Sequence, residues 1–197
     1  MKFDLFYSDY LRCPSCGIII NDSSRSLSQL SKPAPCCGAY GSPREIWPSL
    51  SVSMFFEIVL QQDNSTEEGL RVSIIFLSTA LEVLLEDALW QLFELHTNSL
   101  TIAETLFESN NGRDRRLKLY NSLSDTKFSK LLDFPNGIQF IDRWAKLTKM
   151  RNLLVHGKYF IDKAEAKTIV EFIRDSALEI FVKVENDIKR QATLKSV

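Results

Sequence analysis

The feature that most constrains the fold is a helical period that runs without a break between residues 70 and 92. Neither glycine nor proline occurs in this range, and apolar residues recur at steps of three and four. This spacing places them on one face of a long amphipathic helix that begins near Thr66. The face consists of Leu70, Ile74, Leu77, Leu81, Leu84, Leu85, Ala88 and Leu92. Because such a face must be buried against other elements, the pattern predicts a domain of helices packed around this one.

Four later segments have the same helical character. We predict helices over residues 101–108, 115–123, 138–156 and 163–189. The turn Phe134-Pro135-Asn136-Gly137 precedes the third of them, Gly157 is placed to cap its end, and no convincing alternating strand pattern follows residue 60. The sequence therefore predicts an all-α helical bundle over residues 51–197. Residues 1–50 precede it as a small cysteine-containing unit followed by a linker with two prolines.

The composition of the chain narrows its class. Of its 197 residues 45% are hydrophobic, enough for a real core, and the net charge of −1 gives no sign of general nucleic-acid binding. A nucleic-acid ligand would have to meet local basic patches. The N-terminal residues have no apolar stretch of the secretory kind, and the longest apolar run, near residues 74–85, is interrupted by Ser78, Thr79 and Glu82. We therefore expect a cytoplasmic protein without a membrane segment.

All four cysteines fall between residues 13 and 37. The segment Cys13-Pro14-Ser15-Cys16-Gly17 resembles a zinc-ribbon knuckle. The second pair, Cys36-Cys37-Gly38, departs from that pattern, because Ala34 stands where a second knuckle has its first cysteine. In a reducing compartment four thiolates suit a closed, tetrahedral structural zinc site better than disulfides. We predict one structural Zn²⁺; the alternative is four thiols without a metal. The predicted ligands are Cys13, Cys16, Cys36 and Cys37.

A charged residue falls inside the apolar stripe of the fourth predicted helix. On a helical wheel Arg151 lies about 20° from the centre of that stripe. A charge there is costly unless it is paired or faces a wet cleft. Asn152 and His156, four residues apart, share the flank of the stripe, so the three side chains can reach one small volume at the helix end. The alternative is structural: Arg151 pairs with a carboxylate such as Glu82 or Glu86, and His156 caps the helix.

The segment Arg151-Asn152-Leu153-Leu154-Val155-His156 resembles the motif of HEPN ribonucleases, which is an Arg, a polar residue that is often Asn, three further residues and a His. The stretch Ser78-Thr79-Ala80-Leu81-Glu82 also resembles the opening helix of that family. The resemblance covers roughly residues 65–190. It implies a HEPN-like bundle and a metal-independent endoribonuclease of the toxin or antiviral-defence kind. It also implies an RNA substrate, a homodimer whose motif helices line one cleft, and an antitoxin or defence partner protein.

Carried over to this chain, the resemblance gives each motif residue a role. His156 would act as general base or acid on the ribose 2′-OH or the leaving 5′-oxygen, and Arg151 would bind the scissile phosphate. Asn152 would orient the histidine or the phosphate, with Glu82 as a secondary orienting partner.

Two sets of basic residues could track an RNA backbone, although an ordinary solvated helix face is the alternative for either. The sets are Arg113, Arg115, Arg116 and Lys118, and Arg143, Lys146, Lys149 and Lys158. Two other functions also fit the sequence. One is a non-catalytic HEPN-like module that binds a nucleotide or a partner protein. The other is a zinc-containing interaction protein in which the motif is accidental.

Overall fold

The computed structural model describes residues 10–12, 19–21, 37–38, 44–45, 49–97, 99–157 and 162–195. From residue 49 onward the described residues form helices and their connections, which confirms the predicted all-α fold for this part of the chain. None of these helices combines the length and the apolar composition that a membrane crossing requires. The helices are α1 (Leu50–Leu60), α2 (Glu67–His96), α3 (Leu100–Ser109), α4 (Arg113–Leu123), the 3-10 helix η2 (Phe128–Lys130), α5 (Asn136–Val155) and α6 (Lys163–Lys195).

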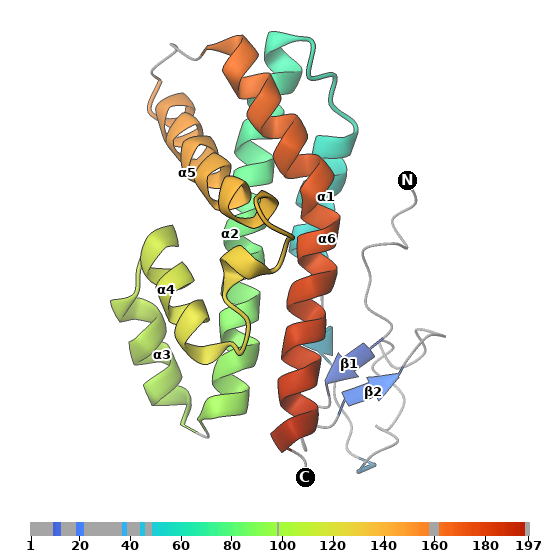
Figure 1. Ribbon diagram of the computed structural model, residues 1–197, viewed down its shortest axis with the longest axis vertical. Coiled ribbons are helices and arrows are strands. Elements are labelled where there is room, and N and C mark those ends of the chain that lie inside the picture. The colour runs from blue at the N-terminus through green and yellow to red at the C-terminus, as the bar shows by residue number, and fades with distance from the viewer. Residues whose placement is uncertain are drawn as a thin grey trace.

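Helix α2 is the central element of the bundle (Figure 1). It is about 45 Å long and packs against α1, α4, α5 and α6. Its start is fixed by Thr66, whose hydroxyl accepts a hydrogen bond from the Gly69 N–H at 3.0 Å. The apolar face predicted from the sequence is buried throughout, because none of its residues from Leu70 to Leu92 is more than 5% exposed.

Aromatic rings join α4, η2 and α5. The ring centroid of Phe128 in η2 lies 5.3 Å from that of Tyr120 in α4 and 5.8 Å from that of Trp144 in α5. Phe140 packs against both Phe128 and Trp144, with centroid distances of 6.4 Å. All four side chains are at most 1% exposed. This part of the core fixes α5 in the bundle and so determines where its last turn projects.

Helix α1 is not predicted from the sequence, in which the first predicted helix begins near residue 66. Its residues Val52, Phe56 and Val59 are fully buried, and the Phe56 ring lies 5.4 Å from that of Phe181 in α6. Ser49 caps its first turn by accepting a hydrogen bond from the Val52 N–H. The helix therefore covers one side of α2 and α6 and closes the core there.

Three short strands precede the bundle: β1 (Tyr10–Arg12), β2 (Ile19–Asn21) and β3 (Arg44–Glu45). They form an antiparallel sheet in the order β2-β1-β3, in which Leu11 of β1 pairs with Ile20 on one side and Glu45 on the other. No strand was predicted in this segment. Residues 13–18, which follow β1 and precede β2 in the sequence, lie outside the described residues.

Candidate functional site

Arg151 reaches from α5 to α2. Its Nη2 donates to Oε2 of Glu82 at 2.6 Å, and the two side chains are 28% and 26% exposed. The charge inside the apolar stripe is thus compensated by a carboxylate, while the pair still borders on solvent. Of the two carboxylates considered from the sequence, Glu82 is the partner of Arg151. Glu86 instead forms an ion pair with Arg116 of α4.

Asn152 is the second residue that holds this guanidinium. Nη1 of Arg151 donates to Oδ1 of Asn152 at 3.0 Å, and Asn152 itself is exposed. An arginine side chain has five N–H donors. Glu82 and Asn152 each accept from one of them, so donors remain on a partly exposed head group. That arrangement leaves Arg151 able to bind an anion such as a phosphate.

His156 lies at the end of α5 and is exposed. Its backbone N–H donates to the Asn152 carbonyl at 3.1 Å. Gly157, which the sequence predicts as the cap, has φ of +70° and donates to the Leu154 carbonyl at 3.1 Å. Among the described residues the His156 ring has no hydrogen-bond partner. The structure therefore joins Arg151, Asn152 and Glu82, and places the imidazole one turn beyond Asn152.

Two apolar residues within the motif are exposed. Leu153 is 36% and Val155 is 61% exposed. On a helical wheel centred on Trp144, Val155 falls within about 80° of the centre of the apolar stripe and is expected to be buried. The buried core contributed by α5 nevertheless ends at Met150, and Leu154 is only partly buried against it. The last turn of α5 thus extends past the core, and it carries apolar side chains into solvent beside His156.

The carboxylates of α2 shape the electrostatics around Arg151. Burial raises the pKa of Glu82, and the positive charge of Arg151 opposes this rise by stabilising the ionised carboxylate. Glu86 raises the pKa of Glu82 further, whereas Arg116 and Arg113 act in the same direction as Arg151. The negative charge of Glu82 therefore depends on the arginines that surround it.

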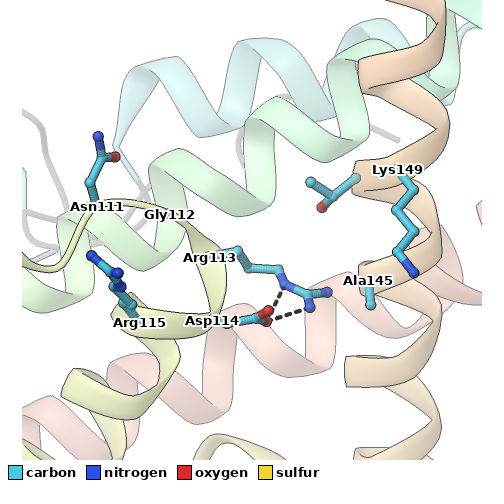
Figure 2. A pocket seen from close by; sticks show the side chains of 8 residues that line it. Asn111, Gly112, Arg113, Asp114, Arg115, Ala145 and Lys149 are labelled. Carbon is cyan, nitrogen blue, oxygen red and sulfur yellow. Dashed lines mark hydrogen bonds and ion pairs between the residues drawn. The ribbon is translucent and has the colours of Figure 1, made fainter.

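An open cleft of about 700 Å³ lies between the start of α4 and the middle of α5 (Figure 2). Arg113 is held in it, because its Nε donates to Asp114 at 3.0 Å and its guanidinium lies 5.8 Å from the centroid of the Trp144 ring. The sequence shows the basic residues as two separate sets, and only the fold brings members of both together. The cleft is lined by Asn111, Gly112, Arg113, Asp114, Arg115, Ala145, Thr148 and Lys149.

Of the predicted zinc ligands, Cys13, Cys16 and Cys36 lie outside the described residues, and Cys37 is exposed. In the sequence, Cys13 and Cys16 fall between the paired strands β1 and β2. Within the described part of the chain no group of three His, Cys, Asp or Glu residues is arranged to hold a metal ion. The set of four thiolates is chemically that of a structural zinc site, which stays a prediction here.

Comparison of the chain with protein-family models, with curated proteins and with solved structures gives no match. The geometry at the end of α5 provides a guanidinium fixed by two side chains and an exposed imidazole on the same helix. Such groups can stabilise an anionic phosphate and transfer protons.

Proposed function

We propose that this chain is a metal-independent endoribonuclease of the HEPN type, which cleaves RNA by attack of the ribose 2′-OH and acts in a toxin or antiviral-defence role. One observation carries the proposal. Glu82 and Asn152 fix the guanidinium of Arg151, and the exposed imidazole of His156 follows one helical turn beyond Asn152. The motif that resembles the HEPN sequence thus has its arginine oriented and its histidine accessible.

The reaction needs only proton transfer and charge stabilisation, because RNA brings its own nucleophile. The 2′-oxygen attacks the adjacent phosphorus while a base takes the 2′-OH proton. The bond from phosphorus to the 5′-oxygen breaks, and that oxygen takes up a proton. The products are a 2′,3′-cyclic phosphate and a 5′-hydroxyl end. In this proposal His156 transfers a proton, Arg151 binds the scissile phosphate through the N–H donors that Glu82 and Asn152 leave available, and Asn152 keeps the arginine in place.

A homodimer joined through the ends of two α5 helices completes the proposal. Cleavage needs one group that accepts a proton and one that donates it, and the motif of one protomer holds a single imidazole. Leu153 and Val155 expose apolar surface beside His156, and a second copy would bury it. Sedimentation of the full-length protein at tens of micromolar tests this point. A dimer is expected, and a monomer at all concentrations would contradict the arrangement.

The central experiment compares wild type and His156→Ala on total RNA in the presence of mild EDTA, after zinc retention has been checked. The loss of a general acid–base should reduce the rate by at least ~10²-fold. His96→Ala is the matched control, because His96 is the other histidine of the chain and is also exposed. That variant should cleave like wild type, and far-UV circular dichroism should show the same helical content for all three proteins.

The products and substrate analogues test the mechanism. The 5′ fragment should end in a 2′,3′-cyclic phosphate, and RNA with 2′-deoxy substitutions should resist cleavage. Cleavage of DNA at a comparable rate, or a strict magnesium requirement, would exclude attack by the 2′-OH as the mechanism.

A non-catalytic HEPN-like module that binds a nucleotide or a partner protein is the second candidate. It is favoured by the ion pair of Arg151 with Glu82, which already compensates the arginine within the protomer. If wild type and His156→Ala both leave RNA intact, this second function replaces the first.

A further inference from the structure

The cleft between α4 and α5 contains two cations that have no partner among the described residues. Arg115 and Lys149 line it, both are exposed, and neither forms an ion pair or a side-chain hydrogen bond with any described residue. Arg113 differs, because its charge is compensated by Asp114 (Figure 2). Three cations and one carboxylate line the cleft, so its net charge is +2. The surroundings favour an anionic ligand, although the whole chain carries a net charge of −1.

The α5 wall of this cleft leads directly to the motif. With 100° per residue, Ala145, Thr148, Lys149, Asn152 and His156 fall within an arc of about 100° on one face of α5. From Lys149 to His156 the helix rises by about 10 Å. At 3.4 Å per nucleotide, the spacing in a fully stacked strand, this distance corresponds to at most roughly three nucleotides, and an extended strand covers it with fewer. An extended polyanion that lies along this face can therefore contact the cleft and the motif at the same time.

We propose that the cleft binds backbone phosphates of the single-stranded RNA whose scissile phosphate lies at Arg151 and His156. This inference rests on the proposed function and adds a second contact region for the same substrate. Arg115 and Lys149 bind phosphates located within roughly three nucleotides of the cleaved bond. The positive end of the α4 dipole adds to the attraction of these side chains. Arg113, fixed between Asp114 and Trp144, forms a rigid wall rather than a mobile contact.

Contacts of this kind bind the substrate without taking part in the reaction. They do not change as bonds form and break, so they contribute equally to the bound substrate and to the transition state. Their removal raises KM and leaves kcat unchanged. They also recognise phosphates and no base, so they give affinity without sequence preference.

A binding measurement tests the cleft without any need for cleavage. The probe is a short fluorescein-labelled polyuridylate, and each variant is made in full-length His156→Ala protein so that the RNA stays intact. We compare Arg115→Gln/Lys149→Gln with Lys127→Gln/Lys130→Gln. The second pair also removes two positive charges, from exposed positions at the start and end of η2 that do not line the cleft.

Loss of two phosphate contacts should reduce the slope of log K against log salt concentration by about 1.4, since each contact to a single strand contributes about 0.7. If the two proteins bind equally at 1 M salt, the cleft variant should therefore bind roughly 25-fold more weakly than its parent at 0.1 M salt. The control pair should keep the parental slope. An unchanged slope for the cleft variant overturns the proposal, and so does an equal reduction for both pairs, which would indicate a diffuse charge effect.

Competition and kinetics complete the test. Polyglutamate at equal charge should compete poorly with the RNA probe, and equal competition would overturn the assignment to an RNA strand in favour of a general polyanion surface. In protein with His156 intact, Arg115→Gln/Lys149→Gln should raise KM and leave kcat unchanged. If the RNA binds at the cleft but is never cleaved, the proposed function fails and the cleft assignment survives. If cleavage occurs with unchanged KM and unchanged salt slope, the cleft assignment alone fails.

Discussion

Asp87 on α2 should make the protein less stable at neutral pH than it is in mild acid. Its carboxyl is largely buried next to Ser49, the N-cap residue of α1. One carboxyl oxygen has no hydrogen-bond partner among the described residues, and a hydrogen bond from Ser49 favours the ionised form. Burial raises the pKa of Asp87 from 3.8 to about 6, and Glu86 adds to the rise. The free energy that corresponds to this difference is about 3 kcal/mol.

The sign follows from proton binding. The pKa of Asp87 is higher in the folded chain than in the unfolded chain, so the folded chain binds more protons between about pH 4 and pH 6. The free energy of unfolding therefore falls as the pH rises through that window. Asp87→Asn keeps the shape of the side chain and removes the buried charge. Near pH 8 it should increase the free energy of unfolding by about 2–3 kcal/mol, and below about pH 4 the gain should disappear.

Urea denaturation followed by far-UV circular dichroism at several pH values measures this effect. The corresponding rise in Tm near pH 8 is roughly 4–12 °C for a chain of this size. Asp142→Asn is the matched control, because Asp142 is an exposed aspartate within α5, and its profile should follow that of wild type. If Asp87→Asn is less stable than wild type near pH 8, or if its gain is the same at every pH, the buried carboxylate is stabilised by contacts and the reasoning is wrong.

Two further predictions concern packing and metal content. Gly137→Ala places a methyl group 2.9 Å from the carbonyl carbon of Ser129 in η2, so it should lower the free energy of unfolding by about 1–3 kcal/mol, as overpacking does. In Gly112→Ala the added methyl group meets nothing within 4 Å, and only the backbone at φ +93° is strained, so the free energy of unfolding should fall by about 1–2 kcal/mol. Native mass spectrometry with metal analysis should find about one zinc per chain, lost in Cys13→Ser, and a metal-free protein with a folded N-terminal segment would refute the zinc site.

The helices that carry the site could be predicted from the sequence because their apolar period is long. The apolar face from Leu70 to Leu92 predicted α2. The buried side of α5 was predicted in the same way, from Phe140, Trp144 and Leu147. Helix α1 escaped prediction although Val52, Phe56 and Val59 have helical spacing. The segment is short and rich in β-branched and aromatic residues, which favour strands when considered locally. Its helical state follows from packing against α2 and α6, which no local pattern contains.

The candidate site was predictable in its residues but not in its contacts. A charge in an apolar stripe indicated that Arg151 needed a partner, and Glu82 was one of two named carboxylates. The choice between Glu82 and Glu86 depends on the position of α4, because Arg116 of α4 forms an ion pair with Glu86 and leaves Glu82 to pair with Arg151. The cleft could not be foreseen, because Arg115 and Lys149 are far apart in the sequence and only the packing of α4 beside α5 joins them.

The contact between Arg113 and Trp144 makes the fluorescence of a core residue sensitive to the charge in the cleft. The indole is fully buried, and the nearby guanidinium belongs to the wall of the cleft. The excited state of an indole has a large dipole, so its emission wavelength responds to the electric field of a neighbouring charge. An anion that enters the cleft changes that field, whereas one bound elsewhere on the surface is screened by solvent within about 10 Å. Trp144 is therefore a built-in spectroscopic reporter of the cleft, and comparison with a Trp144→Phe variant separates its signal from those of Trp47 and Trp90.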